Sequence, residues 1–121
     1  MDIRSYRLRV WQTAMDLTVN LYEITGSFPT HERFGLIAQL RRAAISIASN
    51  FAEGHARSTR GECLQHISIA RGSTIEVEVQ LLIAERIGYA DAESLAVARE
   101  SPSSRFPLPS TAANTYRASA A

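Results

Sequence analysis

The segment from Arg60 to Ile87 constrains the fold more than any other part of the chain. Apolar and small residues recur in it with a strict 4-3-4-3 spacing over three heptads, at Cys63, Ile67, Ala70, Thr74, Val77, Leu81 and Ala84. This spacing places them in one line along a helix, and at ~1.5 Å per residue the helix is roughly 40 Å long. A second line beside it includes Ile75 and Val79, and Gly88 provides the C-cap. The segment therefore predicts a long helix over residues 60–87 with apolar positions on two lines.

Three other segments have the apolar periodicity or the end signals of helices, over residues 7–25, 31–53 and 91–100. The turn after the first contains Gly26 and Pro29, and Thr30 is the expected N-cap of the second helix, with Glu32 in its first turn. Gly54 is expected to end the second helix. Asp91 is the expected N-cap of the fourth.

No segment has the alternating pattern of a strand, so the predicted fold is all-α: an antiparallel, up-down four-helix bundle over residues 1–100. The fourth helix is expected to be truncated, because Pro102, Pro107 and Pro109 follow it and remove backbone donors. Residues 101–121 are rich in proline, serine and alanine and lack periodicity, so we expect a disordered tail.

The predicted second helix has an unusually wide apolar sector. Its members are Leu36, Ile37, Leu40, Ala43, Ala44, Ile45, Ile47, Ala48, Phe51 and Ala52. A helix that covers one side of a core needs an apolar stripe of little more than ~100°, and this sector is nearly twice as wide. The second helix should therefore contact more than one neighbour. Together with the two apolar lines of residues 60–87, this predicts that the chain associates with itself.

Six polar residues share one arc of the second helix, and two interpretations of them remain open. They are Gln39, Arg42, Ser46, Ser49, Asn50 and Glu53. One interpretation is a network of hydrogen bonds between helices or subunits, which fixes their register. The other is a groove for a ligand or phosphate, in which Arg42 contacts the anion and Asn50 and Glu53 provide further polar contacts. A buried polar network needs no ligand to explain it, which favours the first interpretation.

Four arginines are candidate contacts for an anion or nucleic acid: Arg41, Arg42, Arg57 and Arg60. Arg41 lies among apolar residues, where pairing with Glu76 or Glu78 is the favoured role and a phosphate contact the alternative. Arg57 and Arg60 flank a short link beside His55, where helix N–H groups add to their charge. The simpler interpretation of these two is exposed, solvated side chains.

No catalytic, metal or cofactor site is expected. Cys63 and His66 have the i, i+3 spacing of a metal-binding pair, but nothing in the sequence completes a zinc site. Cys63 lies on the apolar line, where burial deactivates a thiol. Gly72 interrupts a long helix and is expected to allow close approach of a neighbouring helix.

The charge composition argues against indiscriminate binding to a phosphate backbone. All thirteen basic residues are arginine, and within residues 1–100 there are eleven arginines and twelve acids. A nucleic-acid surface would therefore depend on uneven placement of charge. The sequence has no apolar run long enough for a membrane span, no secretory signal and a single cysteine, so a cytoplasmic protein is expected.

Several motifs resemble those of the bacterial four helix bundle proteins, also called 23S rRNA-intervening-sequence proteins. They include Val10-Trp11-Gln12, Phe28-Pro29, Phe34-Gly35-Leu36, Gln39-x-Arg41-Arg42-Ala43-Ala44-x-Ser46-Ile47, Asn50-x-Ala52-Glu53-Gly54, Ile69-Ala70-Arg71-Gly72-Ser73 and Gly88-Tyr89. The resemblance covers about residues 8–98 and implies a ring-shaped homo-oligomer, most often a pentamer. A related branch binds nucleic acid through a strongly basic surface, which this chain lacks, and family members continue with a full fourth helix.

These observations predict a non-enzymatic, self-associating bundle linked to ribosomal RNA or another structured nucleic acid. The alternative is a protein–protein adaptor with no nucleic-acid role, whose partner docks on the apolar strip beside the short fourth helix. No small-molecule substrate is indicated.

Overall fold

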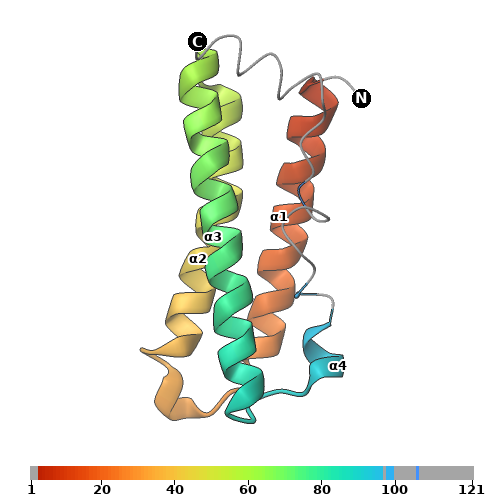
Figure 1. Cartoon of the computed structure of the whole chain (residues 1–121), viewed down its shortest axis with the longest axis vertical. Coiled ribbons are helices and arrows are strands. Elements are labelled where there is room, and N and C mark those ends of the chain that lie inside the picture. The colour runs from red at the N-terminus through yellow and green to blue at the C-terminus, as the bar shows by residue number, and fades with distance from the viewer. Residues whose placement is uncertain (1–2, 97, 100–105, 107–121) are drawn as a thin grey trace.

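The computed structural model describes residues 3–96, 98–99 and 106, and its helices run antiparallel to their neighbours (Figure 1). The three long helices are α1 (Ile3–Thr25), α2 (Leu36–Ala56) and α3 (Arg60–Arg86), and α4 (Ala92–Leu95) has four residues. α2 packs against both α1 and α3. The predicted all-α, up-down architecture with a short fourth helix is confirmed.

The line of small and apolar residues that predicts α3 is buried along its whole length. The members are Cys63, Ile67, Ala70, Thr74, Val77, Leu81 and Ala84. On α2 the buried residues are Leu40, Ala43, Ala44, Ile47, Ala48, Phe51 and Gly54. α1 contributes Tyr6, Val10, Ala14, Leu17, Leu21 and Thr25. The core is thus a continuous column between the three long helices.

The predicted fourth helix, 91–100, differs from the observed α4. The Asp91 carboxylate accepts from the Ser94 amide at 2.7 Å, as expected of an N-cap, but the Ala96 amide already bonds three residues back, to the Glu93 carbonyl. This tighter bond ends the regular helix. Arg99 still forms an ion pair with Glu85 of α3, which holds the segment against the bundle.

The predicted disordered tail, 101–121, lies outside the described residues except for Phe106, and at Phe106 the prediction is wrong. Phe106 is fully buried, its ring centroid lies 5.1 Å from that of Phe51, and its carbonyl accepts from Arg71 Nη1 at 2.8 Å. Leu95 and Ala98 are buried as well. Individual apolar side chains therefore cover part of the face that a full fourth helix would cover.

The start of α2 also differs from the prediction. Thr30–Glu32 forms a separate 3₁₀ turn, η1, and α2 begins at Leu36 rather than at residue 31. Gly35 is the N-cap, and the Glu32 carboxylate accepts from the Leu36 amide at 3.1 Å. The capping carboxylate thus comes from Glu32, because Gly35 has no side chain that could accept the bond.

Tyr89 links the turn after α3 to the turn before α2. Its hydroxyl donates to Glu32 Oε2 at 2.7 Å and lies 3.2 Å from His31 Nε2, and its ring centroid lies 5.5 Å from that of Phe28. Gly88 holds Tyr89 there: with φ of +85° it ends α3 as predicted, and the Tyr89 amide bonds back to the Ala84 carbonyl. We call Phe28, His31, Glu32 and Tyr89 the Tyr89 cluster.

Two glycines have roles opposite to those predicted. Gly54 does not end α2, which continues to Ala56; it is buried where α3 approaches, and a Cβ there would lie 3.2 Å from His66 Cβ and 3.3 Å from the Cys63 carbonyl. Gly72 was expected at a close approach, but among the described residues no atom lies within 4 Å of the place that a Cβ would take there. Close helix packing therefore explains Gly54, and no contact within the described protomer explains Gly72.

Alanine at Gly54 and at Gly61 should have opposite effects on stability. Gly54→Ala should lower the free energy of unfolding by about 1 kcal/mol, because crowding outweighs the gain in helix propensity. Gly61 lies in open space on α3, and Gly61→Ala should raise it by about 0.5 kcal/mol. Urea denaturation of both variants measures the difference, and stabilisation by Gly54→Ala would contradict the close approach.

The Tyr89 cluster should make stability depend on pH. The Leu36 amide and the Tyr89 hydroxyl, in that order, lower the pKa of Glu32 below its ordinary value. A lowered pKa contributes stability above the unfolded-state pKa, and that contribution is lost as the pH falls through the folded-state pKa. Tyr89→Phe should therefore reduce the loss of stability between about pH 6 and pH 3, measured by urea denaturation.

The control for this experiment is Glu32→Gln, which keeps a polar side chain but removes the titrating group. In Glu32→Gln the free energy of unfolding should depend on pH over this range even less than in Tyr89→Phe. The reason is that the Leu36 amide lowers the pKa of Glu32 more than the Tyr89 hydroxyl does. An unchanged acid dependence in both variants would show that Glu32 is not the group responsible.

Candidate functional site

A row of polar side chains crosses the contact between α2 and α3. Gln80 Nε2 donates to Gln39 Oε1 at 3.4 Å, and the hydroxyls of Ser46 and Ser73 lie 3.0 Å apart. The third pair is Asn50 with His66. These residues lie along one line of each antiparallel helix, so the pairs fix the register of α2 against α3.

The Asn50–His66 pair has a defined direction. Asn50 Nδ2 donates to the Ser46 carbonyl at 2.8 Å, which leaves Oδ1 as the acceptor facing His66 Nδ1 at 2.9 Å. His66 Nδ1 therefore carries the hydrogen in this arrangement. His66 thus has a hydrogen-bond partner on α2. The described residues include no group of three or more His, Cys, Asp or Glu that could hold a metal ion.

Beside this row lies a shallow groove of ≈350 Å³ between α2 and α3. Its lining residues are Gln39, Arg42, Ala43, Ser46, Ser73, Glu76 and Gln80. Arg42 is exposed and lies on the same groove as Glu76, so opposite charges neutralise one another there. Arg42 is thus placed with the polar row, in a groove without an excess of positive charge.

Two members of the predicted polar arc do not join this row. Glu53 pairs with Arg57 along α2 itself at 2.7 Å, with 54% and 45% of their side chains exposed. Such an exposed i, i+4 pair contributes only about 0.3–0.5 kcal/mol. Ser49 is exposed. The arc therefore divides into an inner line that meets α3 and an outer line that faces away from it.

Arg41 packs on α1, and the predicted pairing with Glu76 or Glu78 on α3 is wrong. Its Nε donates to Thr25 Oγ1 at 2.9 Å, its Nη2 donates to the Tyr22 carbonyl at 3.3 Å, and its guanidinium lies 4.3 Å from the centre of the Tyr22 ring. A cation at the C-terminus of α1 is favourable because the last carbonyls carry partial negative charge. The apolar sector of α2 packs against both α1 and α3, and the sequence pattern did not show which of the two helices Arg41 would contact.

Arginines gather at one end of the bundle although the chain as a whole is close to neutral. Arg57 and Arg60 flank the α2–α3 connection, and the first turns of α1 carry Arg4, Arg7 and Arg9 at the same end (Figure 1). We call this the basic end. Sequence analysis missed the arginines of α1, which the up-down order of the helices would have placed beside Arg57 and Arg60.

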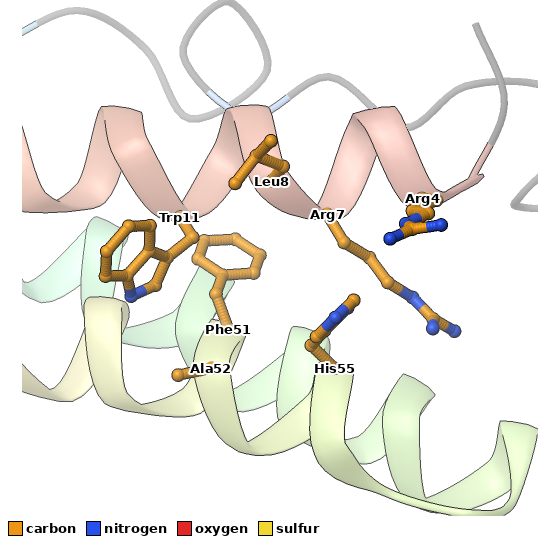
Figure 2. Close-up of a pocket in the computed structure, with 7 residues that line it drawn as sticks. All are labelled: Arg4, Arg7, Leu8, Trp11, Phe51, Ala52 and His55. Atoms are coloured by element: carbon orange, nitrogen blue, oxygen red, sulfur yellow. The ribbon is translucent and has the colours of Figure 1, made fainter.

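A pocket of ≈340 Å³ opens at the basic end between the start of α1 and the end of α2 (Figure 2). Its lining residues are Arg4, Arg7, Leu8, Trp11, Phe51, Ala52 and His55. We call it the Trp11 pocket. Its walls are apolar at Trp11 and Phe51, whereas Arg4, Arg7 and His55 provide N–H donors. None of these residues was selected as a site from the sequence.

Apolar side chains are also exposed in two stripes. The α3 stripe consists of Ile69, Ile75, Val79, Ile83 and Ile87, each 45–55% exposed. The α1 stripe consists of Met15, Val19 and Tyr22. At about 100° per residue the α3 stripe lies roughly opposite the buried line of that helix. α3 is therefore apolar on both its inner and its outer side.

The part of the chain that the structure describes includes no helix long and apolar enough to cross a membrane. Cys63 is buried, as expected for a core position.

The family model described as "23S rRNA-intervening sequence protein" matches residues 6–101, which include most of α1, all of α2, α3 and α4, and most residues of the Trp11 pocket. No curated protein matches the chain.

Proposed function

The chain belongs to the 23S rRNA-intervening sequence protein family, and we propose that it is a non-enzymatic bundle that assembles with copies of itself and contacts structured RNA. The observation that supports self-association is the α3 stripe. A helix at the surface of a monomer normally exposes a polar outer side, whereas here five large aliphatic residues occupy that side. The stripe runs for about 27 Å, from Ile69 to Ile87.

The α1 stripe offers a second, different surface. If the α3 stripe of one copy packs on the α1 stripe of the next, the contact is heterologous, and repeated heterologous contacts form a closed ring when the rotation permits. A pentameric ring is the assembly that the family resemblance leads us to expect. Gly72 lies within the α3 stripe, and its open surroundings in the protomer suit close approach of a helix from a neighbouring copy.

Self-association can be tested by placing a charge in each stripe. Val79→Glu on α3, or Val19→Glu on α1, should reduce the assembly from a multiple of the 13.3 kDa chain mass to a monomer, because a buried unpaired carboxylate is strongly unfavourable. Light scattering after size exclusion measures the mass. Ile45→Glu, at an exposed apolar residue of α2 outside both stripes, is the matched control and should assemble as the unchanged protein does.

Mixing the two variants distinguishes a ring contact from a two-fold dimer. Val79→Glu retains a working α1 stripe and Val19→Glu retains a working α3 stripe, so an equimolar mixture should form dimers through one intact contact. A two-fold contact cannot be restored in this way. A stable monomer of the unchanged protein at micromolar concentration would contradict self-association itself.

The basic end supports the RNA part of the proposal. Five arginines gather there, against two described acids of the same turns: Glu53, which is paired with Arg57, and Glu62 in the first turn of α3. Phosphate contacts in nucleic-acid complexes come mostly from such clusters, and they make binding dependent on salt. The family gives the second support, through the name of the model that the chain matches.

RNA contact predicts a salt-dependent affinity that depends on the basic end. The double variant Arg57→Gln, Arg60→Gln should weaken binding to an RNA hairpin and lower the slope of log K against log salt by about 1–2, as expected when two phosphate contacts are lost. Gel-shift titrations at several salt concentrations measure it. Arg33→Gln with Arg86→Gln, at exposed positions of the opposite end, is the matched control, and Arg42→Ala tests the α2–α3 groove separately.

Absence of binding at low salt would leave self-association as the whole function. The adaptor alternative has weaker support, because Leu95, Ala98 and Phe106 already cover part of the strip on which its partner was expected to dock. A partner that remains bound at high salt and after nuclease treatment would favour the adaptor.

A further inference from the structure

We infer that the Trp11 pocket binds one nucleotide unit, with the base against Trp11 and the phosphate near Arg4, Arg7 and His55. The inference rests on the proposed contact with RNA and makes it specific. In addition to the general attraction of phosphates to the basic end, one unpaired nucleotide enters the Trp11 pocket. Free mononucleotides and nucleotides within a single strand share this chemistry.

The antiparallel helices give the pocket an aromatic end and a cationic end. Along α1, Trp11 lies two turns after Arg4, a separation of about 10 Å. α2 runs in the opposite direction, so that Phe51 lies toward the Trp11 end and His55 toward the Arg4 end. Figure 2 shows this arrangement, with the two aromatic rings at one side and the two arginines at the other.

The aromatic end suits a flat ring. Trp11 is 37% exposed, so part of its indole is available to a ligand, whereas Phe51 is buried and packs against Phe106. Bases stack on such aromatic side chains irrespective of sequence, because every base has a π-face. The volume of ≈340 Å³ is near the lower limit for ligand pockets, which favours a single ring system over a long flexible chain.

The cationic end suits a phosphate. None of the seven lining residues is acidic, and at this end Arg4, Arg7 and His55 carry nitrogen donors. Glu53, close to the pocket along α2, is held by Arg57 on the outer side of the helix. An anion there therefore meets the positive charge of Arg4 without a competing carboxylate among the lining residues.

The single tryptophan of the chain makes the inference directly testable. Because Trp11 lines the pocket, AMP should quench its fluorescence in a saturable manner, whereas adenosine or inorganic phosphate alone should bind at least about tenfold more weakly, since each lacks one of the two contacts. Octanoate tests a fatty anion. Tighter quenching by octanoate than by AMP, or no quenching by AMP and by a single-stranded oligoadenylate, would overturn the inference.

A labelled single-stranded oligonucleotide, followed by fluorescence anisotropy, tests the polymer source. Trp11→Ala should weaken its binding about tenfold, and Trp11→Phe, which retains a stacking face, should restore most of the affinity. Arg4→Gln should weaken it more than Arg9→Gln, because both arginines are exposed in the first turns of α1 but only Arg4 lines the pocket. Circular dichroism establishes that each variant is folded.

The outcomes separate this inference from the proposed function. If the RNA hairpin binds equally well to Trp11→Ala and to the unchanged protein, but loses affinity in Arg57→Gln, Arg60→Gln, then RNA contact stands and the nucleotide pocket is wrong. If AMP quenches Trp11 but no RNA binds at low salt, the pocket takes free nucleotides and the RNA contact fails. If Arg4→Gln and Arg9→Gln weaken oligonucleotide binding equally, the binding is explained by general electrostatic attraction to the basic end, and the inference is overturned.

Discussion

The position of α2 between two helices is the constraint on which the rest of the structure depends. Its apolar sector is wide enough to bury Leu40, Ala44 and Ile47 between α1 and α3, so it contributes to both contacts at once. Apolar packing alone has little directional preference, and the Ser46–Ser73 and Asn50–His66 pairs supply the register on the α3 side. On the α1 side, Arg41 does the same by capping the end of that helix. On each of its two packed faces, α2 therefore combines hydrophobic contact with polar contacts that fix its position against the neighbouring helix.

The helices and the core were predictable because their signals are local and periodic. The line from Cys63 to Ala84 and the caps at Gly88 and Asp91 each depend on residues within a few turns. Gly54 was misread because a glycine near a helix end has the same local signature whether it ends the helix or admits a neighbour. Phe106 lies in a proline-rich segment, where nothing local indicates that a single ring will be buried against Phe51.

The candidate site depended on information that no single segment contains. Arg41 had two candidate acidic partners on α3 but packs on Tyr22 of α1, because the choice between α1 and α3 is made by tertiary packing. The basic end combines the first turns of α1 with the connection between α2 and α3, and the near-neutral composition conceals it. The Trp11 pocket arises in the same way, since its two halves lie on α1 and at the far end of α2.

The Tyr89 cluster lies at the end of the bundle opposite these arginines, and this separation has a dynamic consequence. It joins two connections that are 57 residues apart through a hydrogen bond and a ring contact. At the other end the short α2–α3 connection is exposed. Amide protons should therefore exchange most slowly near Tyr89 and faster at the exposed α2–α3 connection, as expected for local openings that begin in exposed segments. The cross-linked Tyr89 cluster and the exposed arginines therefore lie at opposite ends of the same helices.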